Sequence, residues 1–576
     1  MKADKNKDIL LDNIDILIIG GGSAGLWAAN RAKELDENLE VLIVDKGPVD
    51  WGGLMSISGG DFEAVLPDEN VEDWVKDLVY YYDGLCDQEL VEGLLKKSYD
   101  RLQDYERLGC QFLRKPDGTL KGIPQRGLNH IKLYPAKYKG RGGAEMVQNL
   151  VKEVHSRGVK RIGRTLITDL LKKEGKVIGA VGFDTINGDF YIIKAKAVIL
   201  ATGLTGWKTS YGKNTTAGEG ADLAFRAGAE LCNFEFGRVW NVPKLFGFEG
   251  QTALFPLGAR FINGVGEPLM DKYSPVLGAN TDPHFTTIAM ALEEKAGRGP
   301  FILDVSRVNP EDMQLLKPQT GWQLMNYKKL VDLGIDLFKD NTEWNPQLTV
   351  SFGGIVADLH GRTSIEGLFA AGNARYIDPG VYMGGFALST TAVGGYLAGE
   401  EVVRYINSSD SFTPEIDFNE VEAHKKDLFA LINGNGLTPK EVLRIIQELV
   451  FNPEVAIIKN EEALTKALAG LEKVKTDLLP RMSAKDPHYL LKLIEVKTIA
   501  FITELYLKAS LERKESRAGH YRVDYPGRDD KKFLCWIIAK MNEDGNISFS
   551  QKPVPVDKYK YKIEKYYSDN FTFYKN

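Results

Sequence analysis

The chain has 576 residues and a formal net charge of −6, so it predicts about three structural units and gives no case for binding nucleic acid or an anionic membrane. Its four cysteines are scattered and none forms a CxxC pair, so we expect free thiols in a reducing cytoplasm and no metal or iron–sulfur site held by this chain. The polar start lacks the apolar core of a secretory signal, and no uncharged apolar run reaches ~18 residues, so we expect a cytoplasmic protein with no direct membrane span.

The first strong signal is residues 14–47, which read IDILIIGGGSAGLWAANRAKELDENLEVLIVDKG. An apolar run over 16–19 predicts a buried parallel strand, and a helical pattern follows from 26 to about 35. A second apolar run covers 41–44 and ends in an acid. Strand, helix, strand and acid in this register predict a βαβ unit that binds a dinucleotide.

The glycines of this unit have GxGxxG spacing, and each has a physical role. Gly20 permits the tight turn, Gly22 lets the backbone approach a pyrophosphate, and Gly25 lets the helix pack close to the strand. The helix N-terminus offers N–H groups to the phosphates. Asp45 can accept hydrogen bonds from ribose hydroxyls and would repel the 2′-phosphate of NADP. A glycine-rich turn without a ligand is the plainer alternative, but it does not explain the ordered strand, helix and acid.

Two later segments favour FAD over NAD. KAKAVILATGLTGW (194–207) predicts a buried strand ending at Thr202–Gly203, and SIEGLFAAGNARYIDPG (364–380) predicts another ending at Gly372–Asn373. Small-residue turns at the carboxyl ends of parallel strands lie where ligands bind in open α/β sheets. An FAD-binding chain has such returning strands because it leaves the FAD domain for a second domain and comes back.

The order of these motifs resembles the flavoprotein family of fumarate reductase and succinate dehydrogenase, which includes L-aspartate oxidase and the α subunit of adenylylsulfate reductase. The resemblance covers nearly the whole chain. Further segments that resemble family motifs are TTAGEGADLAFRAGAEL (215–231), AGRGPFILDV (296–305), SFGGIVAD (351–358), ESRAGHYRVDYPGRDD (515–530) and SQKPVPVDKY (550–559).

The resemblance implies an α/β fold with a Rossmann-type FAD-binding domain, an inserted capping domain and a C-terminal helical domain. PKEVLRIIQELVF and KLIEVKTIAFITELYLKASLERKESR have the apolar spacing of helices, and we expect the aromatic tail to wrap the surface. The expected boundaries are 1–235 and 345–415 for the FAD-binding domain, 236–344 for the capping or substrate domain, 416–545 for the helical domain and 546–576 for the tail.

By resemblance the cofactor is FAD, and we expect it to be noncovalent because DWGGLMSISGGDF (50–62) lacks the histidine that some family members use for covalent attachment. Asn373 stands where the family usually has Glu. Ser389 matches a flavin-proximal serine, although an ordinary helix-start residue is an equally good interpretation. A helix from about Ser389 would direct its positive end at flavin N1 and O2. The residues expected at FAD are Gly20, Gly22, Ser23, Ala24, Gly25, Asp45, Lys46, Gly60, Thr202, Gly203, Gly372, Asn373 and Ser389.

The dicarboxylate enzymes of this family carry four elements that this chain lacks. Residues 231–243 have no HPTG-type motif, 281–295 no proton-donor arginine, 346–354 no histidine, and 381–390 no arginine. Two carboxylates need such Arg and His partners, so we expect a substrate other than succinate, fumarate or L-aspartate. The stretch around Glu235 resembles the adenylylsulfate reductase branch, without a clear match for the residues that would hold that substrate.

Two residues are candidates for catalysis. Arg238 could bind an anionic group of the substrate, although a domain-bridging salt link is the plainer interpretation. His284 could act as a general acid near the flavin because histidine titrates near neutrality, and a loop histidine without a role is at least as good an interpretation. Tyr382 and Trp240 could line the pocket and Arg141 could add positive charge, but core aromatics and a surface loop are plainer.

The charged stretch ESRAGHYRVDYPGRDDKKF (515–533) follows a long helix that we expect to end near Arg513. The family context favours a structural role, with ion pairs that lock the C-terminal domain to the FAD domain. His520 is the candidate in this stretch for an approach to the flavin. The residues expected to pair are Arg517, Arg522, Asp524 and Asp529.

The first hypothesis is therefore an FAD-dependent oxidoreductase that transfers a hydride between a small-molecule substrate and flavin N5. Electrons would be exchanged with a separate carrier, which in this family is often an iron–sulfur subunit. One alternative is an α subunit similar to that of adenylylsulfate reductase. Another is a flavin electron-relay or assembly subunit with no small-molecule site of its own. The sequence leaves the oligomeric state open.

Overall fold

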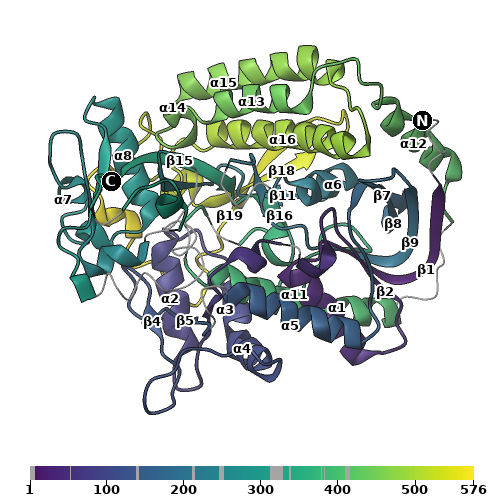
Figure 1. Cartoon of the computed structure of the whole chain (residues 1–576), viewed down its shortest axis with the longest axis horizontal. Coiled ribbons are helices and arrows are strands. Elements are labelled where there is room, and N and C mark those ends of the chain that lie inside the picture. The colour runs from purple at the N-terminus through teal and green to yellow at the C-terminus, as the bar shows by residue number, and fades with distance from the viewer. Residues whose placement is uncertain are drawn as a thin grey trace.

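The computed structural model describes residues 7–51, 53–137, 142–209, 215–245, 252–311, 328–336, 339–377, 379–381, 383–408 and 415–575. Arg141 and Tyr382, two of the pocket candidates, lie outside these ranges. Figure 1 shows a layer of helices along one side of the molecule, and the two ends of the drawn chain at opposite ends of it.

The largest sheet is built around the predicted βαβ unit. Its strands are β1 (Asp8–Ile19), β2 (Val41–Val44), β6 (Lys160–Ile162), β7 (Thr165–Lys173), β8 (Lys176–Asp184), β9 (Phe190–Leu200) and β17 (Leu368–Ala370). Over the described residues the order is β6–β2–β1–β9–β8–β7, and β17 also pairs with β9. β2 covers the residues predicted for it. β1 begins well before the apolar run because its polar first half pairs with β9.

Two helices approach each other closely beneath this sheet. They are α1 (Ser23–Leu35) and α11 (Phe386–Ser408). A Cβ on Gly395 would lie 2.3 Å from the carbonyl oxygen of Ala24, and one on Gly399 would lie 2.4 Å from that of Ala28. Glycines at these positions therefore let the two backbones touch. The contact brings the N-terminal ends of both helices to the same edge of the sheet.

A second, antiparallel sheet comes largely from the inserted segment, and β10 joins it from the preceding part of the chain. Its strands are β10 (Thr205–Gly206), β12 (Gly237–Pro243), β13 (Arg260–Ile262), β14 (Phe301–Asp304) and β15 (Glu343–Ser351). β12 pairs with β15, and the helices α7 (Leu269–Tyr273) and α8 (Pro283–Lys295) belong to the same segment. The boundary expected at 344/345 falls inside β15.

The C-terminal part begins with the helices α12 (Phe418–Ala430), α13 (Pro439–Val450), α14 (Pro453–Ala456), α15 (Glu461–Lys473) and α16 (Pro487–Glu512). Figure 1 shows α16 as the innermost of the helical layer, between α13 and α15 on one side and the body of the molecule on the other. The chain then forms α17 (Asp530–Phe533) and the strands β18 (Cys535–Met541) and β19 (Ile547–Pro553). This hairpin spans the boundary expected at 545/546, and β18 joins β11 (Leu231–Cys232) and β16 (Gly354–Ile355) in one sheet.

The tail alternates exposed residues with buried aromatic rings, so it runs along the surface and inserts its rings into the core. Tyr567 is 0% exposed, and the ring of Phe571 stacks on that of Phe285 in α8 with centroids 4.2 Å apart. Apolar rings contribute most when they leave water, so the tail becomes part of the core beside the capping helix.

The charged stretch after α16 is a buried network. Arg522 donates twice to Asp524 at 2.7 Å, as expected, while Arg517 donates to Glu515 at 2.7 Å and to Asp530 at 2.5 Å. Arg517 also donates to the carbonyl of Asp83 at 2.7 Å, which ties this stretch to the N-terminal half of the chain. Asp529 instead caps α17, where its side chain accepts the N–H of Lys532.

The other described elements complete the body of the protein. No helix within the described ranges is long and apolar enough to span a membrane. These elements are β3 (Asp61–Glu63), β4 (Ile123–Pro124), β5 (Lys132–Pro135), α2 (Val71–Tyr81), α3 (Gln88–Lys96), α4 (Ser98–Arg107), α5 (Gly142–Ser156) and α6 (Glu219–Ala227).

Candidate active site

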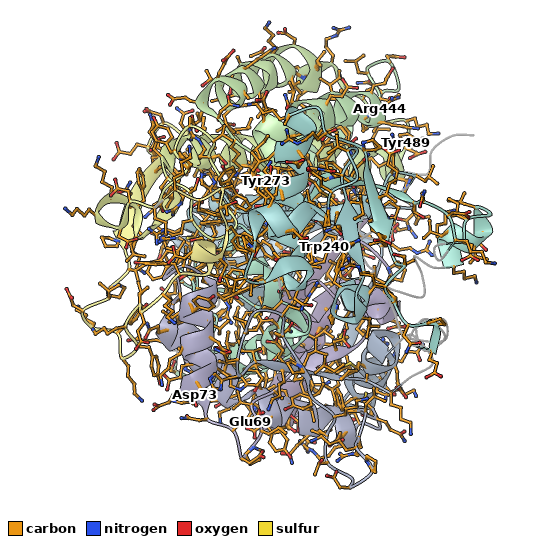
Figure 2. The ribbon with its side chains drawn as sticks, turned by 90° about the vertical axis from the view of Figure 1, so that its left-hand side faces the viewer. Glu69, Asp73, Trp240, Tyr273, Arg444 and Tyr489 are labelled. Carbon is orange, nitrogen blue, oxygen red and sulfur yellow. The ribbon has the colours of Figure 1, made fainter. Side chains whose placement is uncertain are left out.

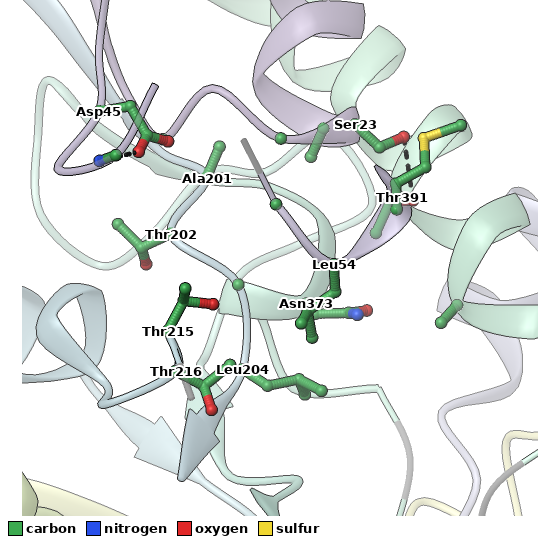
Figure 3. A pocket seen from close by; sticks show the side chains of 18 of the residues that line it. Ser23, Asp45, Leu54, Ala201, Thr202, Leu204, Thr215, Thr216, Asn373 and Thr391 are labelled. Atoms are coloured by element: carbon green, nitrogen blue, oxygen red, sulfur yellow. Dashed lines mark hydrogen bonds between the residues drawn. The ribbon is translucent and has the colours of Figure 1, made fainter. Parts of the chain in front are cut away.

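A cavity of about 610 Å³ lies where the carboxyl ends of β1, β2 and β9 meet the N-terminal ends of α1 and α11 (Figure 3). Its wall includes Gly20 after β1, Asp45 after β2 and Ala201 after β9. Open α/β sheets bind ligands at this edge, and the volume is that of a small-molecule or cofactor site.

The glycine turn is shaped by close backbone contacts. Gly20 has φ +113°, and a Cβ there would lie 2.3 Å from the carbonyl oxygen of Ala201. A Cβ on Gly25 would lie 2.0 Å from the carbonyl oxygen of Gly20, so both positions need glycine for the fold. Gly22 differs, because a Cβ there would meet only the Cα of Gly53 at 3.7 Å. Gly22 caps α1 without a side-chain hydrogen bond, which leaves the first-turn N–H groups for an anion.

Asp45 already accepts two backbone hydrogen bonds at 2.6 Å, from the N–H groups of Gly21 and Gly47. Burial raises the pKa of this carboxyl, and the two N–H groups pull the pKa back down. Each carboxylate oxygen has a second lone pair, so Asp45 can still accept from ribose hydroxyls.

The end of the cavity opposite Asp45 is formed by the start of α11 (Figure 3). The helix begins at Phe386, three residues before the expected start, and Ser389 lies in its first turn. Ser389 is buried and does not line the cavity, whereas Thr390 and Thr391 do. The hydroxyl of Thr391 donates to that of Ser23 at 3.2 Å, which joins the two helix ends (Figure 3).

Most of the residues expected at FAD lie in the cavity wall. Gly25, Gly372 and Ser389 do not: a Cβ on Gly372 would lie 2.6 Å from the Cβ of Ala24, so Gly372 packs α1 against its neighbours. Gly203, with φ +80°, faces open space, where no atom would lie within 4 Å of a Cβ. The residues that do line the cavity are Gly20, Gly22, Ser23, Ala24, Asp45, Lys46, Gly60, Thr202, Gly203 and Asn373.

The sequence reasoning missed cavity residues that come from distant parts of the chain. Leu491, Lys492 and Glu495 of α16 are in the wall, and no local motif marks them because they sit on a long apolar helix. Asp61 could have been found from the sequence, since it directly follows Gly60, which is among the residues expected at FAD.

Arg238 lies in the cavity wall and is 5% exposed. The pairing of β12 with β15 shifts register between Arg238 and Val239, and such bulges re-aim side chains next to functional sites. Its guanidinium lies 4.7 Å from the ring centroid of Trp240, which is buried and is labelled near the middle of the view in Figure 2. Arg238 therefore presents a desolvated positive charge beside an aromatic ring.

His284 lies in the first turn of α8, is 1% exposed and does not line the cavity. Burial lowers the pKa of His284 to about 3, and the positive charges of Lys459 and Arg238 act in the same direction. Burial therefore does not favour His284 as a general acid that titrates near neutrality. His520 is likewise buried outside the cavity wall, with its pKa lowered by burial and by Lys459.

Asp61 places a carboxyl in the cavity wall at the start of β3. Side chains two apart on a strand share a face, so Asp61 and Glu63 point the same way. Glu63 accepts a hydrogen bond from Gln125 at 2.7 Å, and a Cβ on Gly385 would touch Glu63, so this face meets the start of α11. Burial raises the pKa of Asp61 to about 6.

These features fit FAD. The bare backbone at Gly22 and Gly203 leaves room for a close approach of the diphosphate, and the α1 end supplies N–H donors. The start of α11 at the other end of the cavity suits the electron-rich edge of a flavin. The fold and the site define an FAD-binding oxidoreductase.

Comparison with protein families also identifies an FAD-binding protein. Residues 15–388 match the family described as FAD binding domain, and residues 446–566 match Fumarate reductase flavoprotein C-term. The chain belongs to the fumarate reductase and succinate dehydrogenase flavoprotein family and is an FAD-dependent oxidoreductase.

Curated relatives span almost the full length of the chain. A fumarate reductase (CoM/CoB) subunit of Methanothermobacter marburgensis is 29% identical over 89% of this chain and 94% of its own. The fumarate reductase flavoprotein subunit of Mycobacterium tuberculosis is 27% identical over 95% of this chain and 98% of its own.

Solved structures confirm the expected fold class. The flavoprotein of E. coli quinol fumarate reductase matches with a TM-score of 0.86 at 23% identity, over 96% of this chain and 98% of that one. Adenylylsulfate reductase from Archaeoglobus fulgidus matches with a TM-score of 0.81 at 23% identity, over 97% and 99%. At this identity the likeness is one of fold.

Proposed function

We propose that this flavoprotein oxidises or reduces a small anionic substrate other than succinate or fumarate, bound through Arg238. The observation that carries the proposal is that Arg238 lines the cavity from a bulged strand, with its guanidinium beside Trp240. A desolvated arginine binds carboxylate, sulfate or phosphate groups with charge-assisted hydrogen bonds. The absent Arg and His motifs argue against a dicarboxylate, which needs a clamp for each of its two charges.

The chain's own residues would bind and orient the reactants. FAD, held by the glycine turn and the cavity wall, would supply hydride exchange at N5. Arg238 would fix the anionic group of the substrate, and the buried wall would keep water away. His284 does not line the cavity and burial lowers its pKa to about 3, so it would stay neutral and would not transfer the proton. Asp61, with a pKa of about 6, is the better-placed group for moving a proton.

We further propose that electrons pass to or from a separate iron–sulfur subunit, because the sequence has no CxxC pair. Two relatives carry names that mark them as subunits, which supports an assembly. The four buried free thiols support a cytoplasmic location. An α subunit like that of adenylylsulfate reductase is the second candidate, supported by the fold likeness.

The test is a comparison of Arg238→Met and Arg238→Lys with the wild-type holoenzyme. Both variants should keep their FAD, measured by flavin absorbance per chain. Arg238→Met should raise KM for the anionic substrate at least about tenfold, whereas Arg238→Lys keeps the charge and loses only the planar fork, with a smaller effect. Unchanged KM in Arg238→Met would contradict the proposed anchor. Wild-type protein that turns over no small molecule but exchanges electrons with a cluster protein would support the relay role instead.

A further inference from the structure

Four charged side chains, which we term the charge quartet, meet in the cavity wall near Asp45. They are Lys46, Lys208, Glu219 and Glu495. Lys46 Nζ contacts the carboxylate of Glu219 and lies 2.7 Å from Glu495 Oε1. Lys208 Nζ lies 2.6 Å from the other oxygen of Glu495. One carboxylate on α16 thus holds two lysines from the N-terminal half of the chain.

The charge quartet is largely removed from water. The side chain of Glu495 is 5% exposed, that of Glu219 11%, and those of the lysines 18% and 22%. Burial lowers the pKa of Lys46, but Glu219 and Glu495 outweigh it and raise the pKa above its usual range. Burial raises the pKa of Glu495, and the two lysines outweigh it and lower the pKa. Lys46 and Glu495 are therefore charged at neutral pH.

Such a cluster is a poor way to gain stability alone. Buried ion pairs lose about as much in desolvation as they gain, and apolar residues of similar size often do as well. The same helix also carries a comparable trio, in which Glu504 bonds Lys475 at 2.6 Å and also contacts Lys508. That trio lies outside the cavity wall. Acids of α16 can therefore pair with lysines away from the cavity, and pairing alone does not explain why the charge quartet lies in its wall.

The position of the quartet points to a ligand. The glycine turn fixes where a diphosphate would lie, and the Asp45 end beyond it is where a ribose and a base would follow. The start of α11 takes the flavin end. α16 closes the Asp45 end, because Leu491 and Lys492 join Glu495 in the wall. Each ammonium group has three donors, and Lys46 gives two of them to carboxylates.

We propose that α16 forms the outer wall of the adenosine subsite and that Glu495 is a positioning residue for FAD. Glu495 holds Lys46 and Lys208 against the adenosine end, where their ammonium groups meet acceptor atoms of the ribose or base. The packing of the C-terminal helices and the retention of FAD then depend on the same contacts of Glu495. The glycine turn and Asp45 act on FAD from the N-terminal half of the chain, and Glu495 adds a contribution from the C-terminal part.

The matched test uses Glu495→Gln and Glu504→Gln. Each substitution removes one carboxylate charge from α16 that faces two lysines, but only the first changes the cavity wall. Full-length apoprotein is prepared, and its thermal midpoint is measured with and without FAD, together with the FAD dissociation constant by quenching of flavin fluorescence. Glu495→Gln should weaken FAD binding at least about tenfold and shrink the FAD-induced rise in midpoint. Glu504→Gln should leave the FAD dissociation constant and the FAD-induced rise in midpoint within about twofold of their wild-type values.

Wild-type affinity for FAD in Glu495→Gln, or an equal loss in Glu504→Gln, would overturn the proposal. Should Glu495→Gln fail to fold, Lys208→Met replaces it, because that variant leaves the Lys46 contacts with Glu219 and Glu495 in place. Lys208→Met should weaken FAD binding several-fold, and unchanged FAD affinity there would also contradict the proposal.

Discussion

Arg513 donates from Nε to Glu235 Oε1 at 2.9 Å, and both side chains are 0% exposed. The bond joins the end of α16 to the turn before β12, across 278 residues of sequence. Arg238 lies three residues after Glu235, so the C-terminal part of the chain helps to fix the strand that carries the proposed substrate anchor.

Glu235→Ala should lower the free energy of unfolding by about 3 kcal/mol, because it removes a carboxylate acceptor from the buried guanidinium of Arg513. Arg513 keeps Glu515 at 2.9 Å, which places the effect at the lower end of the range for such changes. Urea denaturation measures it. The control is Glu472→Gln, which breaks an exposed pair with Lys475 and should change stability by less than about 1 kcal/mol. Equal effects of the two substitutions would contradict a special role for the buried pair.

Gly22→Ala should separate binding from folding. A Cβ at Gly22 meets nothing closer than 3.7 Å, and replacing Gly by Ala at a helix N-cap costs about 1 kcal/mol or less, so the apoprotein should still fold. FAD affinity, measured by fluorescence, should fall at least about tenfold because the methyl group enters the space for the diphosphate. Gly25→Ala is the contrast, since its Cβ would lie 2.0 Å from a carbonyl oxygen and the apoprotein should unfold. Undiminished FAD binding by Gly22→Ala would count against the assigned diphosphate position.

Asp61→Asn should stabilise the apoprotein at neutral pH. Burial raises the pKa of Asp61 from 3.8 to about 6, so the stability associated with the protonated carboxyl is fully present below 3.8 and is lost as pH rises through about 6. Asp61→Asn avoids that loss. The difference in unfolding free energy between variant and wild type should therefore grow from pH 3.8 to about pH 6 and stay constant above it. Because Asp61 is only partly buried, the gain should be on the order of 1 kcal/mol. Urea midpoints of both proteins across the window provide the check, and a difference independent of pH would refute it.

His284→Gln should reduce the acid sensitivity of the fold. Burial lowers the pKa of His284 from 6.5 to about 3, so its contribution is present above 6.5 and is lost as pH falls. At about pH 5 wild type should have lost about 2 kcal/mol through this group, and the variant should not. The turnover profile between about pH 5 and 8 should be the same in both proteins. A limb that vanishes in the variant would instead identify His284 as a proton donor.

Local motifs let the sequence predict the nucleotide-binding half well. The apolar run at 41–44, the glycine turn and the acid after it lie close together along the chain, and each has one physical explanation. The resemblance to the flavoprotein family allowed the fold class of the rest of the chain to be predicted as well. The polar start of β1 was not predicted because its pairing with β9 is set by distant residues.

Residues whose role depends on tertiary contacts were beyond prediction. Glu495 reaches the cavity only because α16 folds back over it, and its partner Lys46 is 449 residues away. His284 was expected to be titratable because a sequence does not reveal burial, and burial decides its pKa. The charged stretch at 515–533 was rightly expected to form pairs, although Asp529 turned out to be a helix cap.

The most direct measurement of the central claim is reoxidation of the reduced holoenzyme by a panel of oxidants. FAD bound to wild type and to Arg238→Met is reduced without oxygen, and the return of visible flavin absorbance is followed after adding fumarate, adenylylsulfate, other anionic enoates or quinones. The account predicts rapid reoxidation of wild type by an anionic oxidant other than fumarate, and slow reoxidation of Arg238→Met by the same compound. Rapid reoxidation by fumarate, equal in the two proteins, would contradict both the substrate class and the anchor.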